Sequence, residues 1–485
     1  MEEKSEKSKG ELLKEKLFFK AKQGYEVLDD DKIQKAYDFC EGYKKYLDNG
    51  KTEREAACET VKILEQNGFK QYDFGQKYNH GDGVYINNGG KYILAARIGE
   101  KTVDDGVNII AAHIDSPRID LKQRPLYEDN GFAFFKTHYY GGIKKYQWMT
   151  IPLALHGVII KSDGETVNVK IGEDETDPVF CITDLLPHLA KDQYAKNLAD
   201  AFTGEGMNIL IGSRQYKDEQ SVVGDGVHDV PPNTSKISEK IKLNILSILN
   251  EKYDITENDF VSAELSLVPA AKAKDVGFDR SMVGSYGQDD RVCAYPPVIA
   301  LTECTSLDKT AVVILADKEE IGSEGNTSMQ SHIFRHFLES LAENQNVCKV
   351  RTFMNSKCLS ADVNAAFDPN YADVYETKNA AFVNNGVVLT KYTGSRGKSG
   401  SSDASAEFVN YVRRLFDGNN ILWQSSELGK VDQGGGGTVA AYIANLNINV
   451  VDLGVGILSM HAPFEIASKI DIYMMYEASK AFIKA

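Results

Sequence analysis

The first part of the chain carries apolar residues at helical spacing. In residues 29–50, the apolar positions Ile33, Cys40 and Leu47 fall on one helical face. The segment opens with three aspartates and closes with Asn-Gly, which suit the start and the end of a helix. Residues 52–69 repeat this scheme. The pattern therefore predicts a largely helical region up to about residue 85.

Short apolar runs typical of strands follow this helical region. The first of them occupy residues 83–88, 91–99 and 107–115. Residues 124–255 differ, because short β-like runs alternate there with turn clusters and with a polar stretch at 213–236. From about residue 258, apolar strands again alternate with helical segments, which favours a mostly parallel sheet with covering helices.

These patterns predict one α/β domain that is split in sequence by an inserted domain. The α/β domain is expected to comprise residues 1–123 and 256–485, with a mostly parallel sheet and flanking helices. The inserted domain is expected to comprise residues 124–255 and to be rich in β-structure.

Composition narrows the class of protein. The 485 residues are 42% apolar and 26% charged, which is typical of a globular chain. The formal charge of −15 argues against nucleic-acid binding, which needs a basic face. No window is apolar enough for a membrane span, and the charged N-terminus lacks the apolar core of a signal peptide. The seven scattered cysteines contain no C-x-x-C pair, so a cytoplasmic protein with free thiols is expected.

Polar residues directly follow several of the apolar runs. They are His113, Asp115, Asp289, Asp290, Glu319, Glu320, Asp362 and His461. In open α/β sheets, chemistry takes place beyond the carboxyl ends of the strands. Histidine and carboxylate are ligands that suit zinc and similar divalent ions. These residues are therefore candidates for a metal centre.

A pair of metals about 3.5–4 Å apart shares a bridging carboxylate and needs a further carboxylate as proton acceptor. The adjacent Glu319 and Glu320 suit these two roles, with Glu320 as a metal ligand and Glu319 as the base that accepts the proton. Asp115 can accept the free imidazole N–H of His113 and orient the ring. Taken singly, such residues are more often structural or solvated, and Asp289 can equally belong to a helix start with its own ion pair. Spacing alone does not show that they meet in space.

Seven stretches resemble the M18 family of metallo-aminopeptidases, the aspartyl aminopeptidase family. In chain order they are AAHIDSPRIDLK, YGG, PHLA, GQDDR, DKEEIGS, DVNAAFDPNY and VVDLGVGILSMHAPFE. They extend from about residue 110 to 470, and the H-x-D-S-P, E-E-[IV]-G-S and S-M-H elements are specific as a set. The resemblance implies a metallopeptidase α/β domain with an inserted dimerisation and assembly domain. It also implies removal of the N-terminal residue from peptides.

The resemblance further implies a ligand role for five residues. His113 and Asp362 match the ligands of one metal, and Glu320 and His461 match those of the second. Asp289 matches the bridge. The implied cofactors are two divalent metal ions per subunit, zinc in the first place, with cobalt or manganese as alternatives.

Five more positions match non-ligand roles in the family. Glu319 matches the general base, and Asp115 the residue that orients the histidine ring. His188, in the inserted domain, matches a residue that completes a neighbouring subunit's site. Lys391 could meet an acidic side chain or the peptide, and Thr438 sits where a small polar residue can approach the substrate backbone. A structural role for His188 and a solvated position for Lys391 are equal alternatives.

The chain departs from the family pattern near the expected substrate side. Asp289-Asp290 stands where the family often has Asp-Asn, which leaves open which aspartate is the bridge. Asn364 and Asp368 replace common histidines, and residues 140–148 lack the usual third glycine. Preference for acidic N-terminal residues is therefore not implied.

The implied partners are peptides with a free N-terminus and further copies of the chain. Family members form dimers that assemble into tetrahedral dodecamers. Two other functions stay open at this point. One is a related co-catalytic metallohydrolase, such as an M42-like aminopeptidase or a carboxypeptidase, and the other is a catalytically silent scaffold of the same fold.

Overall fold

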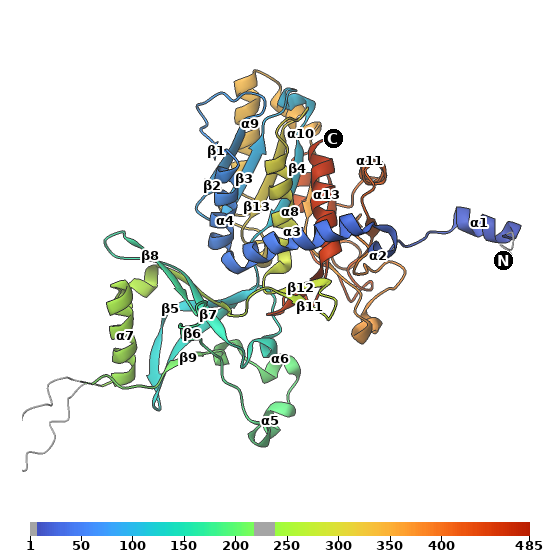
Figure 1. Cartoon of the computed structure of the whole chain (residues 1–485). Helices are drawn as coiled ribbons and strands as arrows, with labels where there is room; N and C mark the ends of the chain where they lie inside the picture. The colour runs from blue at the N-terminus through green and yellow to red at the C-terminus, as the bar shows by residue number, and fades with distance from the viewer. Residues whose placement is uncertain (1–6, 218–237) are drawn as a thin grey trace, which may run out of the picture.

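The computed structural model describes residues 7–217 and 238–485 (Figure 1). Its strands form three sheets, of nine, six and five strands. The predicted polar stretch at 213–236 lies mostly outside the described residues. The expected α/β class is confirmed, since the fold mixes helices with several sheets.

The nine-stranded sheet is the centre of the larger body. Its strands, in spatial order, are β1 (Lys70–Gln71), β2 (Gly83–Asn88), β3 (Tyr92–Arg97), β13 (Ala311–Ala316), β4 (Asn108–His113), β14 (Lys357–Ala361), β18 (Asn449–Gly454), β16 (Val387–Thr390) and β17 (Trp423–Ser425). The four central strands β13, β4, β14 and β18 are parallel. By contrast, β3 and β16 run antiparallel to their central neighbours, and β2 runs antiparallel to β3, so the sheet is mixed with parallel pairs in the majority.

Helices cover both faces of this sheet (Figure 1). On one face lie α3 (Asp30–Asn49), α4 (Glu53–Gln66), α8 (Gln288–Glu303), α11 (Ala406–Gly418) and α13 (Lys469–Ile483). On the other lie α9 (Ile333–Gln345), α10 (Lys349–Met354) and α12 (Ala440–Ala444). Successive strand residues point to opposite faces, so Ile110 packs in the first core and Ile109 in the second. Burial on both faces explains the continuous apolar runs of these strands.

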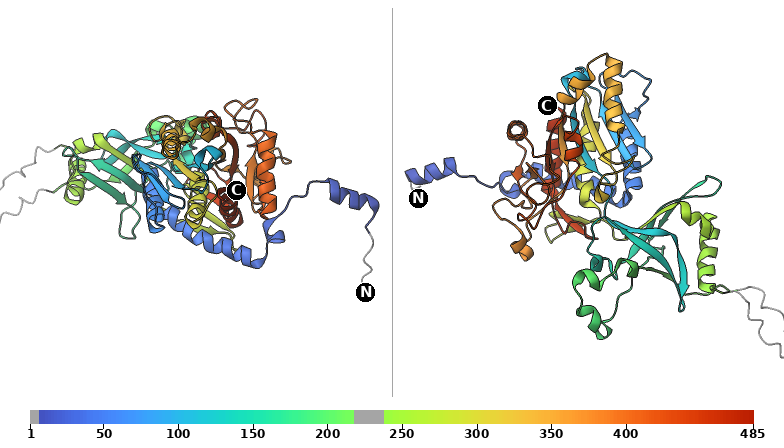
Figure 2. Two further views of the ribbon diagram at one scale, coloured as in Figure 1. Left: turned by 90° about the horizontal axis from the view of Figure 1, so that it is seen from above. Right: turned by 180° about the vertical axis from the view of Figure 1, so that it is seen from behind.

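The predicted N-terminal helices are present, together with two short ones. Asp29 caps α3 by accepting a hydrogen bond from the Lys32 N–H, and Thr52 forms a capping box with Glu55 at α4. Before them lie α1 (Lys9–Leu17) and α2 (Gly24–Val27), and α1 stands away from the rest of the chain (Figure 2). Within the described ranges, no helix is both long and apolar enough to cross a membrane.

The six-stranded sheet forms a second body beside the first (Figures 1 and 2). In spatial order its strands are β8 (Thr166–Ile171), β7 (Leu153–Ile160), β10 (Ala263–Pro269), β5 (Arg118–Asp129), β6 (Phe132–Tyr140) and β9 (Ile209–Gly212). All neighbours are antiparallel, and α7 (Lys240–Tyr253) packs on β5, β6 and β9. A hydrophobic core of its own includes the fully buried Trp148. Two short helices, α5 (Lys191–Tyr194) and α6 (Leu198–Ala201), extend from this body.

The expected inserted domain, residues 124–255, stays a prediction. The six-stranded sheet itself extends from residue 118 to residue 269 and so crosses both expected boundaries. The third sheet has five strands and packs on α3, α8 and α13 of the larger body. It contains β11 (Lys274–Val276), β12 (Met282–Ser285), β20 (Glu465–Ser468), β19 (Gly456–Leu458) and β15 (Asn364–Ala365).

Candidate metal centre

His113 is the last residue of β4 and is buried. Its Nδ1 lies 3.0 Å from the backbone oxygen of Asp115 and 3.4 Å from the Asp115 Oδ1. This contact turns the opposite ring nitrogen inward, where Nε2 lies 3.2 Å from Asp289 Oδ1 and 3.8 Å from Asp362 Oδ1. Asp362 directly follows β14, the strand beside β4, so the sheet itself brings these two side chains together.

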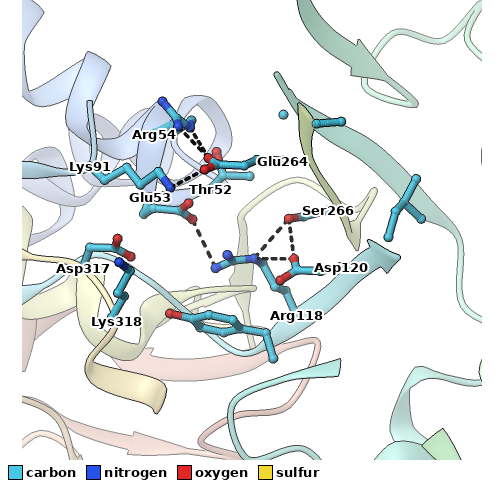
Figure 3. A pocket seen from close by; sticks show the side chains of 14 residues that line it. Thr52, Glu53, Arg54, Lys91, Arg118, Asp120, Glu264, Ser266, Asp317 and Lys318 are labelled. Carbon is cyan, nitrogen blue, oxygen red and sulfur yellow. Dashed lines mark hydrogen bonds and ion pairs between the residues drawn. The ribbon is translucent and has the colours of Figure 1, made fainter. Parts of the chain in front are cut away.

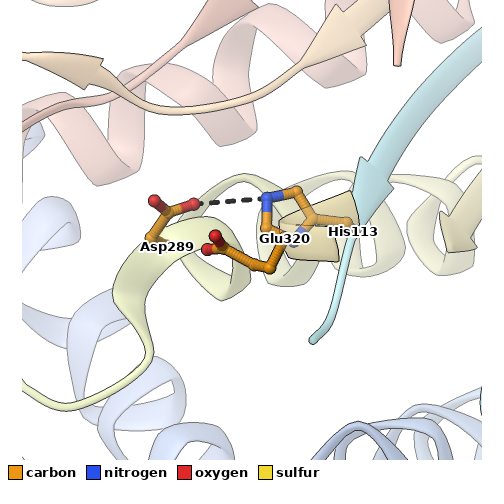
Figure 4. Close-up of side chains that lie close together, drawn as sticks. All are labelled: His113, Asp289 and Glu320. Atoms are coloured by element: carbon orange, nitrogen blue, oxygen red, sulfur yellow. Dashed lines mark ion pairs between the residues drawn. The ribbon is translucent and has the colours of Figure 1, made fainter. Parts of the chain in front are cut away.

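Asp289 lies between two histidines, of which Figure 4 draws His113 beside it. Its Oδ1 is 3.2 Å from His113 Nε2, and its Oδ2 is 3.1 Å from His461 Nε2. Glu320 Oε1 lies 3.5 Å from the same nitrogen of His461. One carboxylate oxygen therefore faces each histidine, as a carboxylate shared by two metal ions requires.

Asp290 occupies a different position from Asp289. Its Oδ2 accepts a hydrogen bond from the backbone N–H of His113 at 3.3 Å. Burial, reinforced by the negative charge of Asp362, raises the pKa of Asp290 well above its usual range. Burial acts in the same direction on Asp289, but its contacts with His113 and His461 lower the pKa of that carboxyl overall. The two histidines thus favour the charged form of Asp289, whereas burial favours the neutral form of Asp290.

Glu319 and Glu320 sit in a tight turn, η7 (Glu319–Ile321), shortly after β13. The turn starts at Lys318, whose φ of 68° lies in the left-handed region. Asp115 accepts hydrogen bonds from both glutamate N–H groups, each at 3.1 Å, one on each of its oxygens. Asp115 therefore fixes the Glu319–Glu320 backbone as well as contacting His113.

Glu465 is a site residue that sequence reasoning did not identify. It is buried on β20, and its carboxylate accepts backbone hydrogen bonds from His461 (2.8 Å), Gln288 (2.7 Å) and Asp289 (3.2 Å). It therefore ties the loop that carries His461 to the loop that carries Asp289. The only sequence signal is its place at the end of the stretch SMHAPFE.

The cluster holds more negative charge than its protein surroundings neutralise. Burial raises the pKa of Glu319 to about 8 and that of Glu465 to about 8, with further increases from nearby carboxylates. In the described part of the chain, no lysine or arginine forms an ion pair with the clustered carboxylates. Asp289 Oδ1 and Glu320 Oε1 are buried without a hydrogen-bond donor. Bound cations would satisfy these oxygens and keep the acids ionised.

The donor atoms fit zinc. Two groups of three residues bring ligand atoms within 4.8 Å of one another, His113 with Asp289 and Glu320, and His113 with Asp290 and Asp362. Imidazole nitrogen and carboxylate oxygen are usual zinc donors.

The structure does not bring the three expected substrate-binding residues into this cluster. His188 is exposed on the short helix η3 (Pro187–Leu189). Lys391 is exposed and forms an ion pair with Asp403 at 3.0 Å. The hydroxyl of Thr438 donates to Asp452 Oδ1 at 2.7 Å. Their roles toward substrate stay predictions.

Comparison with known proteins gives a consistent assignment. The family model of the aminopeptidase I zinc metalloproteases (M18) matches residues 46–483. A probable M18 family aminopeptidase 1 of Clostridium acetobutylicum is 48% identical over 470 residues, which are 95% of this chain and 98% of that protein. The crystal structure of an M18 aminopeptidase from Thermotoga maritima matches with a TM-score of 0.88 at 40% identity, over 96% of this chain and 100% of that one.

A more distant match concerns the fold alone. The mApe1 protein of S. cerevisiae, solved as a dodecamer, matches with a TM-score of 0.72 at 20% identity. The match covers 92% of this chain and 96% of that one.

Proposed function

Since the chain belongs to the M18 family of zinc metalloproteases and is a metallo-aminopeptidase, we propose that it removes N-terminal residues from peptides with two divalent ions at this centre. The position of Asp289, with one oxygen toward each histidine, is the observation that carries the proposal. Asp289 would be the shared ligand. His113 with Asp362, and His461 with Glu320, would complete the two sites.

The ions, zinc in the first place, would polarise the scissile carbonyl and lower the pKa of the attacking water. Glu319 would accept the proton of that water and pass it to the leaving amine. Three observations support this role. Glu319 borders the cluster, it is not paired with a lysine or arginine in the described residues, and Asp115 fixes its backbone at 3.1 Å. A proton acceptor must be ionised, and positive ions beside Glu319 would lower its raised pKa.

We also propose that the chain assembles into dimers and then into a tetrahedral dodecamer. The dodecamer of mApe1 supports this through the shared fold. A second observation is a set of exposed apolar side chains in the second body. They are Leu185, Leu186, Leu189, Tyr194 and Leu198. Apolar side chains gathered on a surface are typical of interfaces.

The proposed location is the cytoplasm. All seven cysteines lie within the described residues and are free thiols. Free thiols are typical of a reducing compartment.

A panel of short peptides tests the proposed reaction. Peptides with free N-termini, peptides with acetylated N-termini and peptides with amidated C-termini would be incubated with chelated enzyme and with zinc-restored enzyme. The proposal predicts zinc-dependent release of the first residue from every free-amine peptide that is cleaved, and none from acetylated peptides. Cleavage that needs a free C-terminus would instead indicate a carboxypeptidase.

A further inference from the structure

Tyr140, the last residue of β6, and Gly142 just after it contact the candidate metal centre from the six-stranded sheet. The Tyr140 hydroxyl donates a hydrogen bond to Asp115 Oδ2 at 2.9 Å. The backbone oxygen of Gly142 lies 2.8 Å from His461 Nδ1. We infer that the Tyr140–Gly142 segment positions the metal-binding side chains, so that the second body contributes to metal binding. The inference rests on the proposed function.

Tyr140 acts through Asp115. That carboxylate is fully buried and accepts three hydrogen bonds, from the Tyr140 hydroxyl and from the N–H groups of Glu319 and Glu320. Removal of the hydroxyl leaves a buried, charged oxygen with one donor fewer. Asp115 would then rotate, and it would carry both His113 and the Glu319 turn with it, because it contacts all of them.

Gly142 acts on His461. Because the Gly142 oxygen can only accept, it holds the proton of the imidazole on Nδ1. The lone pair of the ring is therefore on Nε2, the nitrogen that faces Asp289 and Glu320. A backbone carbonyl that fixes the tautomer in this way is a common companion of a metal-binding histidine.

Gly141 permits this close approach. Its φ is 73°, in the left-handed region, and a Cβ built on it would lie 3.3 Å from Glu320 Cβ and 3.4 Å from Glu320 Oε2. Any larger residue would push against Glu320. The segment therefore forms hydrogen bonds with Asp115 and His461 and passes close beside Glu320.

Arg118 connects the segment to the larger body (Figure 3). Its guanidinium lies 3.9 Å from the centre of the Tyr140 ring and pairs with Asp120 at 2.8 Å. It also pairs at 3.1 Å with Glu53, which is the first residue of α4. These groups line a cavity of about 250 Å³ between the two bodies. Movement at this junction would reach the metal centre through Tyr140.

The variant Tyr140→Phe tests the inference, with Tyr139→Phe as the matched control. Tyr139 is the neighbouring residue on β6, its side chain points to the other side of the strand, and it is 41% exposed. We expect zinc affinity, measured by competition with a chromogenic chelator, to fall about 10- to 100-fold in Tyr140→Phe and to stay unchanged in Tyr139→Phe. The unfolding temperature of the zinc-free proteins should fall only slightly in Tyr140→Phe, because one buried hydrogen bond is lost but no packing.

Two glycine variants provide an independent test of the inference. Gly141→Ala and Gly131→Ala both place a side chain at positive φ, 73° and 88°. Only the first meets Glu320, since nothing lies within 4 Å of a Cβ at Gly131. We expect Gly141→Ala alone to lose zinc affinity.

The outcomes separate the inference from the proposed function. If the wild-type chain holds zinc and Tyr140→Phe retains it as tightly as Tyr139→Phe does, the inference is wrong and the proposed function stands. If the wild-type chain binds no zinc after metal restoration, the proposed function fails, and the inference fails with it.

Discussion

At the scale of single residues, the two adjacent glutamates Glu319 and Glu320 have different surroundings. Glu320 contacts His461, whereas Glu319 makes no ion pair with a histidine in the described residues. We expect Glu319→Gln to lower kcat about 10²- to 10⁴-fold, because a neutral amide cannot accept the water proton. Zinc content, measured by mass spectrometry, should stay at the wild-type level. Glu324→Gln, an exposed residue of the same loop, is the control.

The two aspartates of the GQDDR stretch should respond differently to the same substitution. Asp289→Asn removes a charged oxygen between two histidines, so most bound zinc should be lost. Asp290→Asn replaces a carboxyl whose burial raises its pKa and favours the neutral form, and the amide oxygen can still accept the His113 N–H. Zinc content in the Asp290 variant should therefore stay near that of the wild type. Equal loss in both variants would contradict the assignment of Asp289 as the bridge.

The site residues that directly follow strands could be predicted from the sequence. The residues that contact the site from other sheets could not. His113 and Asp362 end adjacent parallel strands, so the strand-end rule of α/β sheets brings them together. Tyr140 and Glu465 lie in other sheets, and their contact with the site depends on how three sheets pack. An isolated tyrosine or glutamate in a sequence carries no sign of such packing.

At the scale of elements, a buried charged network joins α4 to β7 and β8. His156 on β7 lies 2.8 Å from Glu55 and 3.0 Å from Glu173, and Lys51 lies 2.7 Å from Glu173. Burial opposes ionisation of Glu173, but His156 and Lys51 more than offset it and lower its pKa from 4.5 to about 2. Both bodies of the molecule contribute to this network.

The lowered pKa of Glu173 predicts a pH dependence of stability. A carboxyl with a depressed folded-state pKa stabilises the fold above its unfolded pKa and loses that contribution as the pH falls through the folded value. We expect Glu173→Gln to be less stable than the wild type at pH 6, and the difference to shrink between pH 4.5 and about 2. Urea unfolding at several pH values measures this. A difference in unfolding free energy that stays constant between pH 6 and about pH 2 would contradict this prediction. Glu175→Gln, which changes an exposed neighbour, is the control.

Element type was more predictable than element direction. The helices expected at 29–50 and 52–69 match α3 and α4 closely, because spacing and caps are local signals. The antiparallel direction of β16 is set by pairing with β18, which is distant in sequence. The helix-start alternative holds only in part, because Asp289 and Asp290 have non-helical backbone angles within the first turn of α8. Arg291 donates to backbone oxygens of Lys51 and Ile114 rather than to an aspartate.

At the scale of the whole molecule, the proposed assembly sets the mass of the particle. Multi-angle light scattering should give twelve times the 53.7 kDa of one chain. Leu189→Asp places a charge among the exposed apolar side chains of the second body and should reduce the particle to smaller species. A wild-type particle with the mass of one chain would contradict the proposal.

The most direct test of the central claim is to locate the metal ions. Crystals of zinc-restored protein would be measured above and below the zinc absorption edge. The account predicts two anomalous peaks about 3.5–4 Å apart on either side of the Asp289 carboxylate. One peak should lie beside His113 and Asp362, and the other beside His461 and Glu320. A single peak at full zinc saturation, or peaks away from Asp289, would contradict a two-metal centre.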